Sequence, residues 1–180
     1  MIEQKPKTAL VIVDVQEGMF GLPGMGPVQR DELLNNIHTL IERARHSNCT
    51  IIYIQHQGTG DQPLAKTSPG YAIAHEIAPW SGDKIVSKTE CGMFHKTELD
   101  NVLSALDLRR LVICGMQTEF CVDTAVRTAV DHAYEVIVAS GAHATFDTDE
   151  LSAGTVAKHH ETVWRQAFGQ VLNVSDISFP

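Results

Sequence analysis

The sequence is poor in cysteine, has no long apolar segment and carries more acidic than basic residues. None of its four cysteines (Cys49, Cys91, Cys114 and Cys121) forms a C-x-x-C pair, so neither a disulfide framework nor a zinc site is indicated. No apolar run approaches the length of a membrane span, and no signal-peptide core is present at the N-terminus. The net charge of -8 argues against a nucleic-acid partner. We therefore expect a cytoplasmic protein with no membrane partner.

The sequence does contain a regular alternation of strand and helix patterns. Hydrophobic residues make up 43% of the 180 residues, enough for one domain over residues 1–180 with a sizeable core. Apolar runs predict strands at residues 9–13, 50–55, 84–87, 111–114, 135–139 and 170–174. Helical spacing predicts helices over residues 31–46, 99–106, 121–134 and 149–168, the last with Thr148 as its N-cap. This alternation is typical of an α/β fold whose parallel sheet is covered on both faces.

Three polar residues follow predicted strands. Asp14 ends the first strand, Lys88 ends the third, and Cys121 opens the helix that follows the fourth. The carboxyl ends of parallel strands meet at one edge of the sheet, which is where ligands bind in such folds. The sequence therefore predicts that a carboxylate, an ammonium and a thiol gather there.

These three groups have complementary chemistry. Cys121 would be a nucleophile, because the free N–H groups and dipole of a helix start, together with Lys88, lower the pKa of a thiol. Asp14 would carry the proton. For each residue taken alone, another interpretation stays open. Cys121 would then be a structural thiol, Asp14 a helix or turn cap, and Lys88 a solvated surface charge.

The long connections 18–29 and 56–81 leave the same edge, where loops usually determine specificity. Phe20, His56 and Phe94 are candidate substrate-binding residues, because each lies in a loop or at a strand end beside the expected site. Cys91 follows Lys88 by three positions, and we interpret it as a thiol without a role in the site. The histidines form no set at ligand spacing, so no metal site is predicted.

These motifs resemble the isochorismatase-like cysteine hydrolases, a superfamily that includes nicotinamidases and related amidases. The resemblance lies in 11–16 (Val-Ile-Val-Asp-Val-Gln), in 88–99, in 115–127 around Cys121, in 140–145, and in the pair His159-His160. It implies a three-layer α/β/α fold with six parallel strands in the order 3-2-1-4-5-6. It also implies a triad of Asp14, Lys88 and Cys121, and a cis peptide between Met116 and Gln117.

Two positions depart from the family pattern. Gly141 stands where the family often has the aspartate of Asp-Ala-His. Gln55-His56-Gln57 stands where nicotinamidases carry an Asp-x-His metal motif. We therefore expect neither a metal nor another cofactor.

The predicted function is hydrolysis of a small amide-type C–N bond through a thioester, with the backbone N–H groups of Gln117 and Cys121 holding the oxyanion. The alternatives are cleavage of a vinyl ether, as in isochorismatase proper, and a catalytically idle binding protein on the same fold.

A homo-oligomer, a dimer or larger, is also expected, chiefly from the resemblance. The chain adds one argument. The 56–81 connection carries more apolar surface than a free loop normally shows to water, namely Leu64, Tyr71, Ile73, Ile77 and Trp80.

Overall fold

A six-stranded parallel sheet forms the centre of the molecule. The structure is a computed structural model that describes residues 6–22 and 24–180, so residues 1–5 and 23 of the predicted 1–180 domain lie outside it. The strands are β1 (Thr8–Val13), β2 (Thr50–His56), β3 (Lys84–Lys88), β4 (Arg110–Met116), β5 (Glu135–Ala144) and β6 (Gln170–Asn173). Their order is β3-β2-β1-β4-β5-β6, as predicted.

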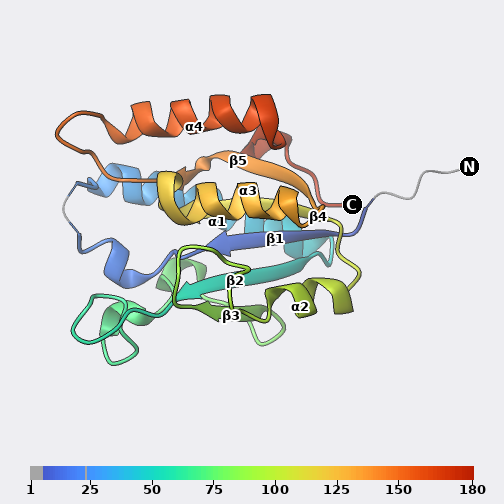
Figure 1. The fold of residues 1–180 in the computed structure, drawn as a ribbon, viewed down its shortest axis with the longest axis horizontal. Coiled ribbons are helices and arrows are strands. Elements are labelled where there is room, and N and C mark those ends of the chain that lie inside the picture. Colours follow the sequence, from blue (N-terminus) through green and yellow to red (C-terminus); the bar gives the residue numbers. More distant parts are fainter. Residues whose placement is uncertain (1–5, 23) are drawn as a thin grey trace, which may run out of the picture.

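Four α-helices cover the sheet: α1 (Pro27–His46), α2 (Leu99–Ala105), α3 (Asp123–Asp131) and α4 (Ala153–Ala167). In Figure 1, α1 lies behind the sheet while α2 and α3 lie in front of it. The sheet is therefore covered on both faces, which confirms the predicted three-layer architecture.

Alternate residues of each strand enter two separate cores, because successive side chains of a strand point to opposite faces. Leu10 and Ile12 of β1 pack with the apolar stripe of α1 and with the C-terminal segment. Val11 and Val13 pack with α2, α3 and Trp164 of α4. Since the central strands are buried on both faces, they are continuous apolar runs in the sequence, whereas the edge strands β3 and β6 are more exposed.

Three helices begin elsewhere than predicted, and one of them, α3, begins at Asp123 and not at residue 121. α1 starts four residues earlier than residue 31, with Gly26 as its N-cap and the Gln29 side chain accepting the Gly26 N–H at 2.9 Å. α4 starts at Ala153, not at 149, and its N-cap is Ser152, whose side chain accepts the Thr155 N–H. Thr148 closes a turn before the helix by accepting the N–H groups of Glu150 and Leu151. The sequence contained two hydroxyl residues fit to cap this helix, and the prediction chose the wrong one.

The register brings the ends of the central strands together. Val13 of β1 pairs with Ile54 of β2 on one side and with Gly115 of β4 on the other. On the neighbouring pair, His56 of β2 lies beside Lys88 of β3. One edge of the sheet therefore holds the ends of all four strands, from β1 and β4 to β2 and β3.

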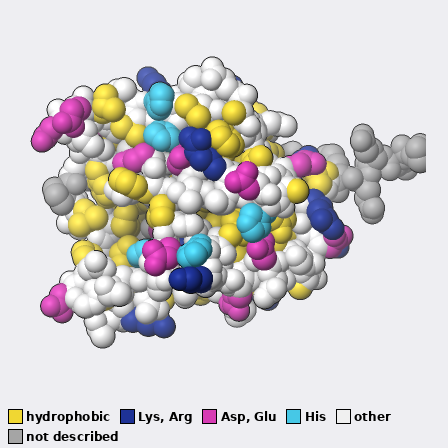
Figure 2. Space-filling model, in the orientation of Figure 1, with side chains coloured by type: hydrophobic (Ala, Val, Ile, Leu, Met, Phe, Trp, Pro, Cys, Tyr) yellow, Lys and Arg dark blue, Asp and Glu magenta, His cyan; other side chains and the backbone are white. Residues whose placement is uncertain are grey.

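The described surface is mixed in character. Figure 2 shows acidic and basic side chains interspersed, with histidines among them and no continuous basic area on the face in view. Within residues 6–22 and 24–180, no helix has both the length and the apolarity that a bilayer crossing requires.

Candidate active site

Asp14 is the first residue after β1, and its backbone is left-handed, with φ of 52°. Its N–H still continues the ladder by donating to Ile54 O at 3.0 Å. Left-handed backbone is unusual outside glycine and is often found at functional sites. The side chain is almost completely buried, although a carboxylate is rarely buried without a partner.

That partner is Lys88. Its Nζ lies 2.7 Å from Asp14 Oδ2, and the two side chains are 0% and 3% exposed. Lys88 Nζ also donates to Cys121 Sγ at 3.2 Å and to the Glu90 carbonyl at 2.9 Å. One ammonium thus contacts both the carboxylate and the thiol. The structure brings Asp14, Lys88 and Cys121 together, and we refer to them as the triad.

Cys121 lies in the segment that joins β4 to α3. The prediction placed it at the start of an α-helix. In the structure it lies inside a single π-helical turn, Thr118–Val122, and α3 follows directly. The Met116–Gln117 peptide before this turn is cis, as the resemblance implied. Among the described residues, no backbone or side-chain acceptor pairs with the Gln117 N–H, so that donor is available to a ligand.

Gly115 permits this arrangement. Its φ is +128°, and a Cβ at this position would lie 2.1 Å from Val13 O. The end of β4 therefore approaches the end of β1 more closely than any side chain allows. This close approach holds the turn that carries Cys121 beside Asp14.

The electrostatics of the site differ from the prediction in one respect. Burial raises the pKa of Cys121, the Asp14 carboxylate raises it further, and Lys88 offsets only part of this rise. The predicted lowering of this thiol's pKa is therefore wrong, because desolvation disfavours the thiolate.

The pKa values of Asp14 and Lys88 are both raised. Burial raises the pKa of Asp14 against the opposing influence of Lys88. Burial alone would lower the pKa of Lys88, but Asp14 and Cys121 together raise it above its ordinary value. Asp14 Oδ1 has no hydrogen-bond partner among the described residues, so it can accept the proton of the thiol.

His56, a predicted substrate-binding residue, borders the triad. Its Nδ1 is 3.4 Å from Lys88 Nζ, and burial followed by the Lys88 charge lowers its pKa. A neutral imidazole beside the ammonium can accept a hydrogen bond. Its place in substrate binding stays a proposal.

Gln16 was missed by the sequence interpretation, although it lies two residues after Asp14. It is fully buried, and its amide is satisfied on both sides. Nε2 donates to the carbonyls of His56 and Tyr71 at 3.0 and 2.8 Å, and Oε1 accepts the His56 N–H at 2.8 Å. Gln16 therefore ties the end of β1 to the end of β2 and to the 56–81 connection.

A buried polar chain behind the π-helical turn was also not predicted. Thr118 Oγ1 lies 3.0 Å from His143 Nδ1, and His143 Nε2 lies 3.3 Å from Glu161 Oε1 of α4. This hydrogen bond to His143 lowers the pKa of Glu161. This polar chain holds the turn against β5 and α4, and it could not be predicted because its members are far apart in the sequence.

The two aromatic candidates are placed differently from the expectation. The Phe94 ring stacks on His132 at 4.3 Å between centroids and, at 6.0 Å, on Tyr134. These partners follow the C-terminus of α3. Phe20 packs against the α1 core, with the Arg30 guanidinium 4.9 Å from its ring. Both rings have packing partners of their own, and a place for Phe20 and Phe94 in substrate binding stays a prediction.

Gly141, which stands where the family often has an aspartate, lies in β5. Its carbonyl accepts Asn36 Nδ2 of α1 at 2.8 Å, and a Cβ here would lie 3.2 Å from the same nitrogen. The side chain of an aspartate at this position would therefore start in close contact with α1. The glycine thus affects how α1 packs on β5.

The residues at the position of the nicotinamidase metal motif form other contacts. Gln55 Nε2 donates to the Tyr71 carbonyl at 2.9 Å, while His56 faces the Lys88 ammonium. A cluster close enough to share an ion lies elsewhere, at Glu17, His75 and Glu76. There, Arg30 already pairs with Glu76. These three residues are exposed or half-buried, and we assign them no role.

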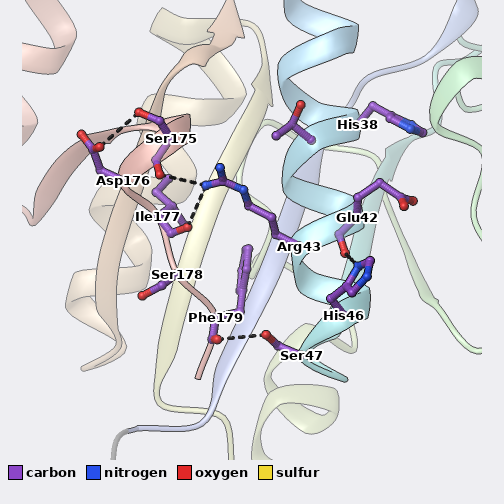
Figure 3. Close-up of a pocket in the computed structure, with 11 residues that line it drawn as sticks. His38, Glu42, Arg43, His46, Ser47, Ser175, Asp176, Ile177, Ser178 and Phe179 are labelled. Carbon is purple, nitrogen blue, oxygen red and sulfur yellow. Dashed lines mark hydrogen bonds between the residues drawn. The ribbon is translucent and has the colours of Figure 1, made fainter.

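A cavity of about 680 Å³ lies away from the triad, between α1 and the C-terminal segment 175–179. Figure 3 shows Arg43 reaching across it toward that segment. The guanidinium donates to the carbonyls of Val174, Ser175 and Ile177 at 2.7, 3.0 and 3.2 Å. Because this donor set is already used by the chain's own backbone, we interpret the cavity as structural.

The apolar side chains of the 56–81 connection are mostly not free surface. Ile77 is buried, and Leu64 and Ile73 pack against the α1 core of their own domain. Trp80 is 64% exposed, but the Arg45 guanidinium lies 3.5 Å from its ring centroid. Most of the apolar side chains of the 56–81 connection therefore pack against their own chain, Trp80 stays exposed, and the homo-oligomer stays a prediction.

Comparison with known proteins identifies the family and the fold. The family model described as the isochorismatase domain matches residues 8–176. Among solved structures, a cysteine hydrolase from Pseudomonas syringae pv. phaseolicola 1448A superposes with a TM-score of 0.86 and 30% identity, over 94% of this chain and 90% of that one.

Two curated relatives are hydrolases by name. A streptothricin hydrolase from Streptomyces noursei is 31% identical over 143 residues, which is 79% of this chain and 56% of that protein. A ureidoacrylate amidohydrolase from Rhizobium rhizogenes is 28% identical over 211 residues, covering 97% of this chain and 84% of that protein. The chain spans only about half the length of the streptothricin hydrolases that it matches.

Proposed function

This chain belongs to the isochorismatase family, and from that membership we propose that it is a cysteine-dependent hydrolase of a small amide-type C–N bond. The observation that carries the proposal is the buried Lys88 ammonium, which contacts Asp14 at 2.7 Å and Cys121 at 3.2 Å. A structural thiol has no need of such a neighbour. The names of the curated relatives, one of them an amidohydrolase, support C–N hydrolysis as the reaction class.

The first half of the reaction forms a thioester. Asp14 takes the proton from Cys121, and the sulfur attacks the carbonyl carbon of the substrate. The carbonyl oxygen becomes an oxyanion, which the backbone N–H groups of Gln117 and Cys121 stabilise. The protonated Asp14 then gives its proton to the leaving nitrogen, the C–N bond breaks, and ammonia or an amine departs.

The second half restores the thiol. Asp14, again ionised, takes a proton from water, and the hydroxide attacks the thioester carbon. The C–S bond breaks, the acid product leaves, and Cys121 recovers a proton from Asp14. A carboxyl with a raised pKa suits this role, because it accepts and returns a proton more evenly than an ordinary aspartate.

Lys88 stabilises negative charge as it moves between Asp14 and Cys121. Substrate binding removes solvent from the site, and the thiolate forms at the moment of attack. The resting thiol with its raised pKa is consistent with this order of events. His56, beside Lys88, is positioned to meet a polar group of the substrate.

Two other functions have to be separated from this one. A vinyl ether hydrolase on the same fold would not need Cys121. An idle binding protein would hold a ligand without turnover. Cys121 among charged neighbours favours the amidase over both.

The experiment measures ammonia release from a panel of small amides, carbamoyl compounds and ureido acids. We expect turnover by the natural chain and none by Cys121→Ala. Asp14→Asn, which cannot carry the proton, should lose roughly 10²–10⁴-fold in kcat. Cys49→Ala is the matched control, because Cys49 lies at the other end of the sheet, where its Sγ donates to Thr8 O.

The outcomes differ for each function. Cleavage of isochorismate that survives in Cys121→Ala would point to the vinyl ether reaction. Saturable binding without turnover of any compound would point to a binding protein. Full amide turnover by a folded Cys121→Ala would refute the thioester mechanism.

A further inference from the structure

A second cysteine lies beside the triad. Cys91 Sγ is 3.8 Å from Cys121 Sγ, and Cys91 is exposed whereas Cys121 is half-buried. The sequence interpretation assigned Cys91 no part in the site. Among the described residues, neither of the other two cysteines contacts another sulfur. Cys49 Sγ donates to Thr8 O, and the buried Cys114 Sγ donates to Val11 O.

We propose that Cys91 is a resolving cysteine, which forms a reversible disulfide with Cys121 after a peroxide has oxidised Cys121. The disulfide blocks the nucleophile and protects it from irreversible oxidation. The regulatory meaning of this pair rests on the proposed function, but the chemistry of the two thiols does not.

The reaction takes two balanced steps. In the first, the Cys121 sulfur attacks one oxygen of hydrogen peroxide, the O–O bond breaks, and a sulfenic acid and water form. The thiol is oxidised and the peroxide is reduced. In the second, the Cys91 sulfur attacks the Cys121 sulfur, the S–O bond breaks, and the hydroxyl leaves as water with the Cys91 proton. A dithiol such as dithiothreitol reverses the product by exchange.

The groups that prepare Cys121 for attack on a carbonyl also prepare it for peroxide. Asp14 can accept the thiol proton in either reaction, and the Lys88 ammonium at 3.2 Å stabilises the sulfur as it loses that proton. A site that activates a thiol is therefore a site at risk of oxidation. A second thiol within contact distance limits that risk.

The backbone around Cys91 allows the bond to close. The sulfurs must approach by a little under 2 Å, to the S–S length of about 2.05 Å. Cys121 is held in the π-helical turn, but Cys91 lies in the irregular segment between β3 and α2. Thr124 Oγ1, 3.3 Å from Cys91 Sγ, holds this sulfur on the Cys121 side without burying it. An exposed thiol in an irregular segment can make the remaining movement.

The test follows the full chain after treatment with a small excess of hydrogen peroxide and then with dithiothreitol. Mass spectrometry of the intact protein should show the loss of two hydrogen atoms. A non-reducing peptide map should join the Cys91 peptide to the Cys121 peptide. Amidase activity should fall with the same time course and return with dithiothreitol.

The Cys91→Ser variant is the decisive comparison, with Cys49→Ser as its matched control. In Cys91→Ser, peroxide should add two or three oxygen atoms at Cys121, and dithiothreitol should restore little activity. Cys49→Ser should behave like the natural chain. Circular dichroism checks that each variant is folded, and substitution of the exposed Cys91 is not expected to unfold the protein.

Two results would overturn the proposal. One is a peptide map without a Cys91–Cys121 link although Cys121 has been oxidised. The other is equal recovery of the Cys91→Ser variant and the natural chain. Because the mass readout needs no substrate, a chain that forms the disulfide but hydrolyses no amide would refute only the proposed function.

Discussion

Replacing Lys88 by methionine tests whether the buried ammonium is what allows Asp14 to be ionised inside the protein. Methionine keeps the apolar volume of the lysine stem, so the variant loses the charge and little packing. The Asp14 carboxylate, 3% exposed, then has no cation to pair with among its described contacts. Breaking a buried ion pair from one side costs about 3–5 kcal/mol of unfolding free energy.

The loss should depend on pH in a defined direction. Burial already raises the pKa of Asp14 above its ordinary value of 3.8. Without Lys88 it rises further, so the folded variant holds the carboxyl proton to a higher pH than the unfolded chain does. By linkage, the variant loses stability as the pH rises from 3.8 through the folded-state pKa of Asp14. The variant should therefore be closer to the natural chain at pH 5 than at pH 8.

Urea denaturation followed by tryptophan fluorescence measures this loss. With a slope of roughly 2 kcal/mol per M of urea, the midpoint should fall by about 1.5–2.5 M near neutral pH. The double variant Lys88→Met with Asp14→Asn removes both charges and should recover most of the loss. If the double variant is as unstable as Lys88→Met, or if the loss of stability is the same at pH 5 and pH 8, then the Lys88 ammonium does not offset the cost of burying the Asp14 carboxylate.

Three further predictions concern Glu161, metal dependence and the oligomeric state. Glu161→Gln should lower the unfolding free energy by about 1 kcal/mol at pH 7; because the Glu161 pKa is lowered, the difference should shrink as the pH falls below 4.5, and denaturation at pH 7 and pH 4 checks this. Activity should survive exhaustive dialysis against EDTA, since Gln55 and His56 bond elsewhere, and a loss that zinc or iron restores would contradict this. Sedimentation equilibrium at micromolar concentration should show a homo-oligomer, an expectation that now rests on the family resemblance alone, and a monomer would contradict it.

The strands and the edge that carries the triad were predictable from the sequence patterns, whereas the order of the strands was implied by the family resemblance. Asp14 and the turn that carries Cys121 each follow an apolar run that forms a strand buried on both faces, and Lys88 ends the more exposed strand β3. The first residues of the helices were predicted less accurately, because more than one nearby residue can serve as an N-cap. At α4, Thr148 and Ser152 both carry a hydroxyl that can cap, and only Ser152 accepts an N–H of the helix.

The parts that could not be predicted depend on distances across the fold. The pKa of Cys121 follows from its burial and from Asp14, more than a hundred positions earlier in the chain. Gln16, His143 and Cys91 are ordinary residues in the sequence. Each gains its place through contacts with residues far away in the chain, among them a carbonyl of β2 for Gln16, a hydroxyl of the π-helical turn for His143, and the sulfur of Cys121 for Cys91.

The contact between Gly115 and Val13 O also determines how this protein can be diversified in the laboratory. Every other amino acid carries the Cβ for which position 115 has no room, so even alanine is a poor substitute there. A saturation library at this codon would consist almost entirely of damaged clones, and random mutagenesis would find no route through it to a new specificity. Screening effort for altered substrates is better placed at exposed Phe120 or at His56, where side chains can change without separating the strand that carries the acid from the strand that leads to the thiol.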